Sequence, residues 1–231
     1  MTTADIGVTI ADMEIFDGLA DDDRALLAAH LHRTLVPANT YVMSLEQPGD
    51  VVYIITDGAV RVQAEQEDGS LVILALLSTG DVLGEMSALD SAGRSATVVT
   101  LEPCELLWLD RDTFLNYLRT HPVLAYNVLR VMSRRLRLAN ERIQALATLD
   151  VAGRVAGQLA AFAVEYGRPT TDGRRLIPFR LTQSELSDLV GASRERVNQV
   201  LGVLRRAGLI DVDAQLRITV RDVDALRRRA R

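Results

Sequence analysis

Short apolar runs separated by turn-forming residues dominate the chain between residues 40 and 110. Runs such as VVYII and LVILALL are rich in β-branched residues, and Gly or Asp interrupts them about every 8 to 12 residues. This spacing predicts an antiparallel all-β unit, either a sandwich or a small barrel. The segment EDGS at residues 67–70 separates two strand-like runs and predicts a hairpin turn.

Helical patterns flank this β-rich region on both sides. Residues 9–31 have a helical pattern, with the segment DDDR at 21–24 placed as a first turn. After Asp110 the pattern becomes helical again, and Pro122 begins a long run that ends near residue 149. Within that run, apolar residues are spaced alternately by 3 and 4 positions: Leu129, Met132, Leu136, Ala139, Ile143 and Leu146.

This apolar seam has two interpretations. The helix can pack on its own domain, or it can pair with a second helix. The length of the run, the strict alternation and the surrounding Arg134, Arg135, Arg137 and Arg142 favour a partner helix. A second copy of the chain is the simplest partner, so we expect a homodimer.

The last third of the chain begins at Asp150, which is a predicted N-cap for the helix that follows. Residues 167–175 are expected to form a loop. Two short helices and a hairpin-like pair, GLIDVD and QLRITV, follow before an Arg-rich end. The predicted domains are residues 1–121, a helix with its hinge at 122–149, and residues 150–231.

Charge divides the chain into two different parts. The 231 residues are enough for one to two domains, and their net charge of −5 by itself argues against nucleic acid. However, residues 1–149 contain 11 Arg and 21 acidic residues, whereas residues 150–231 contain 15 Arg and 10 acidic residues. The basic part is therefore suited to the phosphates of nucleic acid.

The single Cys104 excludes an internal disulfide and a four-thiolate cluster. His30, His32 and His121 form no haem or metal pattern, so no metal is expected. Because no apolar run could span a membrane and no basic leader precedes the first apolar residues, we expect a cytoplasmic protein.

The segment GDVLGEMSALDSAGRSAT carries the candidate ligand chemistry of the first part. One turn of helix is expected to begin with Gly84 and Glu85 and to offer N–H groups to an anion, with Arg94 adding charge-assisted bonds. Because a carboxylate repels a phosphate, Glu85 fits only if it accepts from a hydroxyl. A phosphate beside a sugar hydroxyl is the chemistry of a cyclic ribonucleotide. The alternative is a structural ion pair between Glu85 and Arg94 in a roll that binds no ligand.

Residues 182–204 have the pattern of a helix-turn-helix. Thr182 and Glu185 form a predicted capping box, Gly191 is suited to a left-handed turn, and Ser193 caps the second helix. The apolar positions of that helix fall on one face: Val197, Val200, Leu201 and Leu204. An ordinary helical hairpin is the alternative. The caps, the basic charge and the wing-like segment GLIDVDAQLRITV favour a DNA-reading helix, because Arg, Glu, Asn and Gln can recognise base edges.

On these motifs, nearly the whole chain resembles the Crp/Fnr family. The GE and RSA motifs, with QPGD at 47–50, are similar to the family's phosphate-binding cassette, and LVGASRERVNQVL is similar to its recognition motif. The resemblance implies an α+β protein. Its parts are an N-terminal antiparallel β-roll of jelly-roll type that binds a cyclic nucleotide, a long dimerisation helix and a C-terminal winged helix-turn-helix.

The resemblance also implies roles for individual residues. Gly84 and Glu85 are expected at the ribose 2′-hydroxyl, and Arg94 with Ser95 at the cyclic phosphate, together with the backbone of Met86 and Ser87. The expected DNA contacts are Arg194 and Glu195 on bases, Arg196, Asn198 and Gln199 nearby, and Thr182 and Ser193 on phosphates.

Two positions depart from the family pattern. Gln199 stands where a family member has Arg, so the resemblance assigns no third base contact. Asn140, beside Ala139, replaces a Thr-Ser pair that contacts adenine in that member. The Asn140 amide can both donate to and accept from an adenine edge, so cyclic AMP is the expected ligand.

We therefore expect a homodimeric, cyclic-AMP-responsive transcription regulator that binds palindromic promoter DNA, with RNA polymerase as a further partner. No enzyme is expected, because no catalytic triad, metal cluster or pair of carboxylates is evident in the sequence. Two alternatives remain. One is a DNA-binding regulator of the same fold that needs no ligand or senses another small molecule. The other is a cyclic-nucleotide-binding module that acts on a protein partner.

Overall fold

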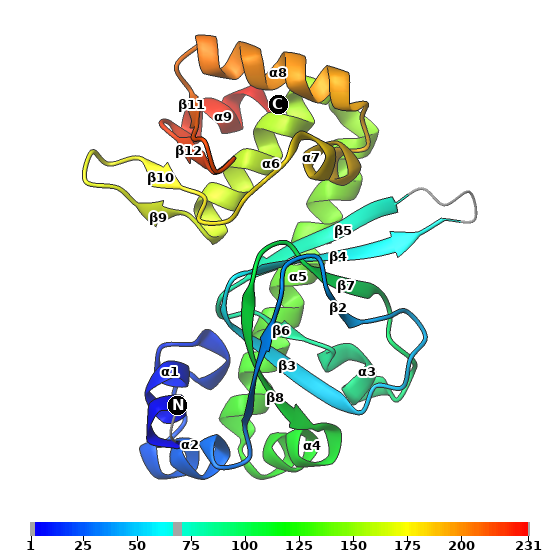
Figure 1. Cartoon of the computed structure of the whole chain (residues 1–231), viewed down its shortest axis with the longest axis vertical. Helices are drawn as coiled ribbons and strands as arrows, with labels where there is room; N and C mark the ends of the chain where they lie inside the picture. The colour runs from blue at the N-terminus through cyan, green and yellow to red at the C-terminus, as the bar shows by residue number, and fades with distance from the viewer. Residues whose placement is uncertain (1–2, 67–70, 231) are drawn as a thin grey trace. The chain divides into compact units, whose positions relative to one another are not determined.

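The computed structural model describes residues 3–66 and 71–230. The chain divides into two compact units, each described by itself below (Figure 1). One unit comprises Met1–Ala64 and Ala75–Arg137, and the other comprises Glu65–Leu74 and Leu138–Arg231.

The first unit is built around a roll of two antiparallel sheets, as the alternation of apolar runs and turns predicts. Its strands are β1 (His32–Val36), β2 (Tyr41–Met43), β3 (Val51–Asp57), β4 (Ala59–Glu65), β5 (Leu71–Ser78), β6 (Val82–Leu83), β7 (Thr97–Thr100) and β8 (Cys104–Asp110). One sheet has the order β1-β8-β3-β6 and the other the order β2-β7-β4-β5. Ile55, Val60, Leu83, Val98 and Leu106 are buried in one apolar cluster of this roll. The hairpin predicted at residues 67–70 lies outside the described residues.

The helical pattern predicted over residues 9–31 is present in part, as separate helical pieces rather than one helix. The structure has α1 (Thr3–Ala11), a short 3-10 helix at Glu14–Phe16, and α2 (Asp21–Ala28). Gly18 breaks the stretch with φ +74°, a left-handed conformation that a continuous helix does not contain. The three separate pieces place Ile10, Phe16 and Leu27 in one apolar cluster with residues of the roll. The acidic segment at 21–24 does form a first helical turn, that of α2.

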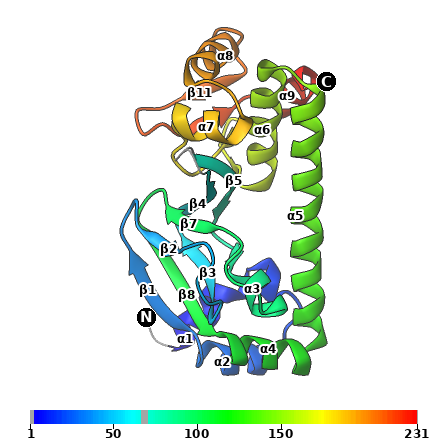
Figure 2. The same ribbon diagram turned by 90° about the vertical axis from the view of Figure 1, so that its right-hand side faces the viewer.

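Two helices follow the roll, as predicted. The Asp110 side chain accepts from the Thr113 N–H at 2.8 Å and caps α4 (Arg111–Thr120). Pro122 begins α5 (Pro122–Thr148), which runs unbroken over 27 residues (Figure 2). Near the start of α5, the buried Asn127 amide donates to the carbonyls of Ile15 and Asp17 at 3.2 and 2.7 Å. These bonds attach the 3-10 segment to the long helix.

The second unit combines helices with a small antiparallel sheet. Its elements are α6 (Val151–Glu165), β9 (Arg168–Pro169), β10 (Arg175–Leu176), α7 (Gln183–Val190), α8 (Arg194–Arg206), β11 (Ile210–Val212), β12 (Ile218–Val220) and α9 (Val223–Arg229). Asp150 caps α6 by accepting from the Gly153 N–H at 2.8 Å, as predicted. The sheet has the order β11-β12-β10-β9. The prediction of a plain loop at 167–175 is therefore incomplete, because its ends form the short strands β9 and β10, which pair with each other. Strand β10 also pairs with β12, more than 40 residues away in the sequence.

Candidate functional site

The turn from β6 into α3 (Glu85–Asp90) depends on Gly84. This residue has φ +78°, and a Cβ placed on it would lie 2.1 Å from Arg94 Nη1 and 3.0 Å from the Val51 carbonyl oxygen. Only glycine combines the left-handed conformation with so close an approach of backbone and guanidinium. The helical turn expected at Glu85 is confirmed.

Arg94 is a buried cation held by three acceptors of the protein. Its side chain is only 5% exposed. Nη1 donates to Ser87 Oγ at 2.9 Å and to the Gly84 carbonyl at 3.1 Å, and Nη2 donates to the Val51 carbonyl at 2.6 Å. Burial lowers the pKa of the guanidinium below its ordinary value, and the opposing charge of nearby acidic groups offsets part of this shift. The pKa of an Arg is so high that the group keeps its charge.

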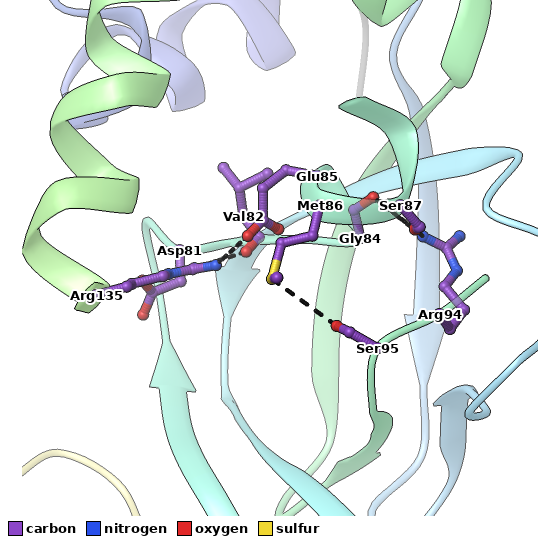
Figure 3. A network of polar contacts seen from close by, with 9 residues as sticks. All are labelled: Asp81, Val82, Gly84, Glu85, Met86, Ser87, Arg94, Ser95 and Arg135. Atoms are coloured by element: carbon purple, nitrogen blue, oxygen red, sulfur yellow. Dashed lines mark hydrogen bonds and ion pairs between the residues drawn. The ribbon is translucent and has the colours of Figure 1, made fainter. Parts of the chain in front are cut away.

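Glu85 is also buried, and its partner is on α5. Its carboxylate, 4% exposed, accepts from Arg135 Nη1 at 2.6 Å. Arg135 Nη2 in turn donates to the Val82 carbonyl at 2.7 Å and lies 3.4 Å from an Asp81 oxygen. Figure 3 shows the Glu85 side chain directed towards Arg135 and the Arg94 guanidinium directed towards Ser87. Within the described part of the chain, no ion pair joins Glu85 to Arg94, so the alternative of a direct pair between them is wrong.

The other residues predicted for the ligand site differ in exposure. Ser87 is buried and donates to the Gly84 carbonyl at 3.1 Å. Met86 is 46% exposed, and its sulfur accepts from Ser95 Oγ at 3.8 Å (Figure 3). Arg94 and Ser95 lie just before β7, which begins two residues after Ser95. Asn140 is an exposed residue of α5 and belongs to the other unit.

Sequence reasoning missed Arg135 as a member of this cluster. It was noted only as one of four Arg residues that surround the apolar seam. Its position five residues before Asn140 on the same helix was the available signal. The 50 residues between Glu85 and Arg135 hid the contact, because local patterns reveal only neighbours within a helix or hairpin.

The helix-turn-helix is formed by α7 and α8. The capping box of Thr182 and Glu185 is present, Gly191 ends α7 with φ +62°, and Ser193 caps α8 by accepting from the Arg196 N–H. The apolar face predicted for the second helix is confirmed, because Val197, Val200, Leu201 and Leu204 are buried. The strands β11 and β12 follow as the predicted wing-like pair.

The polar face of α8 is exposed and linked by side-chain contacts. Arg194, Glu195, Arg196, Asn198 and Gln199 are all exposed. The amide of Gln183 on α7 donates to Asn198 Oδ1 at 2.8 Å. Along α8, Gln199 accepts from Arg196 Nη1 at 3.2 Å and donates to Glu195 Oε1 at 3.4 Å.

Two further findings concern the described residues only. No group of three or more His, Cys, Asp or Glu side chains there could hold a metal ion. None of the described helices is both long enough and apolar enough to cross a membrane.

Comparison with known proteins assigns each unit to a class. A family model described as a cyclic nucleotide-binding domain matches residues 33–121, and a Crp-like helix-turn-helix domain matches residues 153–229. A "CRP-like cAMP-activated global transcriptional regulator" of Mycobacterium tuberculosis is 34% identical over 223 residues, which cover 96% of this chain and 98% of that protein.

Solved structures agree with this assignment. The catabolite activator protein of Thermus thermophilus matches with a TM-score of 0.52 and 32% identity, over 94% of this chain and 98% of that one. The regulator CLP of Xanthomonas campestris, described as c-di-GMP responsive, matches with a TM-score of 0.67 and 27% identity, over 83% of this chain and 94% of that one.

A cyclic-nucleotide-binding roll and a winged helix-turn-helix in one chain define a ligand-sensing transcription regulator. The chain belongs to the Crp/Fnr family of such regulators.

Proposed function

We propose that this regulator binds a cyclic nucleotide, with cyclic AMP as the first candidate, and that the ligand controls its affinity for DNA. The contact between Glu85 and Arg135 is the observation that carries the proposal. It joins the turn that would hold the ligand to the long helix α5, with a 2.6 Å bond between two charged groups. A ribose hydroxyl that donates to Glu85 changes the partners of that carboxylate, and therefore those of Arg135.

The chemistry of the cassette suits a cyclic phosphate beside a ribose. Arg94 supplies a buried positive charge, and Ser95 supplies an exposed hydroxyl nearby. The phosphate competes with the three acceptors that hold Arg94 in this structure. Gly84, with Met86 and Ser87, brings the backbone close to the ligand. Asn140 is the candidate for the adenine edge, which it can both donate to and accept from.

A homodimer formed through α5 is part of the same proposal. Leu129, Leu136, Ile143 and Leu146 of the seam are 62%, 63%, 65% and 54% exposed. Large apolar side chains at heptad spacing are exposed in this way when a second helix covers them. The proposed domains are then residues 1–121, 122–149 and 150–231, and the dimer works in the cytoplasm as a regulator without enzymatic activity.

Each recognition helix of this dimer is proposed to read one half of a two-fold symmetric DNA site. Arg194 and Glu195 contact bases, Arg196, Asn198 and Gln199 lie beside them, and the helix N-caps Thr182 and Ser193 face phosphates. RNA polymerase is the proposed partner at the promoter.

Calorimetry followed by DNA binding tests the proposal. The full chain is titrated with cyclic AMP, cyclic GMP and cyclic di-GMP, and its affinity for a palindromic site is then measured with and without each nucleotide. We expect cyclic AMP to bind and to tighten DNA binding at least 10-fold. Equal DNA affinity in all conditions refutes the ligand control. Binding of cyclic di-GMP alone favours the alternative of another small molecule, the response named for the Xanthomonas relative.

A seam variant tests the dimer separately. Leu136→Arg places a charge in the seam and is expected to give a monomer by light scattering, with DNA affinity reduced more than 100-fold. Leu26→Arg is the matched control, because Leu26 is similarly exposed (60%) but lies on α2. A Leu136→Arg protein that remains dimeric contradicts the proposed interface.

A further inference from the structure

We propose that Asn198, held by Gln183, supplies the third base contact of the recognition helix, and that Gln199 acts as a brace for its neighbours. This inference rests on the DNA-reading role proposed for α8. In this proposal Gln183, on helix α7, positions the Asn198 side chain of α8.

The first observation is the pair of amides that joins the two helices. Gln183 is the first residue of α7, and its Nε2 donates to Oδ1 of Asn198 on α8 at 2.8 Å. Asn198 is exposed on the polar face, so the bond is not a by-product of core packing. A side chain fixed before binding loses less rotational freedom when it meets its target. Gln183 therefore prepares Asn198 for contact.

The second observation concerns Gln199. Both ends of its amide are used within α8, because Oε1 accepts from Arg196 and Nε2 donates to Glu195. One acceptor site and one hydrogen of the Gln199 amide are therefore already engaged, and turning the amide away towards a base edge loses these contacts, including the one to the Glu195 carboxylate. As a brace, it keeps Glu195 and Arg196 in place while both remain exposed.

The geometry of a helix places Asn198 between the two residues proposed to read bases. Residues turn by about 100° each, so Asn198 projects about 40° from Arg194 and about 60° from Glu195 around the helix axis. The next residue on that side, one turn later, is Gly202, which has no side chain to compete for the same base edges.

The direction of the Gln183 bond predicts which bases Asn198 prefers. Since Oδ1 already accepts from Gln183, the amide presents its Nδ2 hydrogens to the groove. Acceptors there are N7 of either purine, O6 of guanine and O4 of thymine, whereas cytosine offers only a donor. We expect selection against cytosine on the contacted strand, at the position between the bases read by Arg194 and Glu195.

Selection from a DNA library with random half-sites tests this assignment. Selection is carried out for the full chain with and without cyclic AMP. The variants are then compared with the wild-type chain in the condition in which the wild-type chain enriches sites. Asn198→Ala is expected to reduce the base preference about 10-fold at the intermediate position, which lies between the bases read by Arg194 and Glu195. The preferences at those two bases should stay unchanged. Gln183→Ala should weaken the same position about 3-fold, and the double variant should equal Asn198→Ala alone, since Gln183 acts through Asn198.

Two further variants separate this role from a structural one. Gln183→Glu replaces the donor by an acceptor, so the Asn198 amide should turn and the preferred base at that one position should change. Gln199→Ala should leave the intermediate position intact and weaken selection at the Glu195 position. Thermal melting checks that all variants fold like the wild-type chain.

The possible failures are distinguishable. If the wild-type chain enriches no sequence in either condition, the proposed DNA-reading role fails, and this inference fails with it. If the wild type selects a site but Asn198→Ala keeps its full pattern, or Gln199→Ala removes the third preference, only the present inference is overturned.

Discussion

In the ligand cassette, Glu85 and Arg94 are 4% and 5% exposed, whereas Arg194 and Glu195 at the start of α8 are both exposed. The same two residue types thus stand in opposite environments. A buried charge is stable only when the fold supplies its partners, and both cassette residues have them in this structure. An exposed charge is solvated by water and needs no partner within the protein, so its contribution to binding depends on the molecule that contacts it.

This difference explains why the acidic first part of the chain can hold an anionic ligand. A single phosphate needs one well-placed cation in a site of reduced polarity, where charge interactions are stronger than in water. A DNA backbone presents many phosphates and responds to the summed field of a surface. The net charge of +5 over residues 150–231 therefore favours binding to a DNA backbone, and the net charge of −10 over residues 1–149 does not prevent the binding of a single phosphate.

Replacing Arg94 is expected to give the largest effect. Arg94→Ala removes the guanidinium donor to the Val51 carbonyl and to the Ser87 hydroxyl, and one of the donors to the Gly84 carbonyl, so we expect about 3 kcal/mol less free energy of unfolding and loss of cyclic-nucleotide binding. Urea unfolding and calorimetry measure the two losses. Arg119→Ala, at an exposed position of α4, is the control and should change stability by less than about 0.5 kcal/mol. Retained nucleotide affinity in Arg94→Ala would show that the cassette is misassigned.

A matched pair of glycines tests the tight packing of the cassette. Gly84 and Gly80 have φ +78° and +94°, but a Cβ on Gly84 meets Arg94 at 2.1 Å, whereas a Cβ on Gly80 meets nothing within 4 Å. Both Ala variants carry the backbone penalty of about 1 kcal/mol. We expect Gly84→Ala to lose about 2 kcal/mol more than Gly80→Ala in urea unfolding. Equal losses would mean that the backbone conformation alone matters at this turn.

For the exposed charges of α8, we expect a substitution to change DNA specificity but not the stability of the fold. Arg194→Ala should relax selection at one base pair by about 1–3 kcal/mol. Its free energy of unfolding should stay within about 0.5 kcal/mol of the wild type, because its side chain is exposed. A site-selection assay and urea unfolding of the same preparation give both values. A large loss of free energy of unfolding would show that Arg194, like Arg94, has a structural role in the fold.

The smallest expected effect comes from the single thiol of the roll. Burial raises the pKa of Cys104 from 9.0 to about 11, so the folded chain keeps the thiol proton where the unfolded chain has begun to lose it. The stability that this group contributes is complete below pH 9 and is lost as the pH rises through about 11. We expect slow alkylation by iodoacetamide at pH 8 in the folded protein and fast alkylation in urea. Equal rates would contradict the burial of Cys104.

The local features of both sites could be predicted from the sequence. The caps at Asp150, Thr182 and Ser193 all form as predicted, because each depends on residues within one helical turn. The polar and apolar faces of α8 follow from helical spacing in the same way. The exposed polar face of α8 can therefore be predicted from the sequence, because its side chains depend on no distant partner for their position.

Tertiary structure decided the rest. The pair of Glu85 and Arg135, the bond from Arg94 to the Val51 carbonyl and the pairing of β10 with β12 all join residues more than 40 positions apart. The break of the helical pattern near Gly18 likewise follows from packing against the roll. Residue type and spacing show that a buried charge must find a partner. Which group becomes the partner depends on how the whole chain packs. A buried side chain has little contact with water, so it can form hydrogen bonds only with groups that the fold brings close to it.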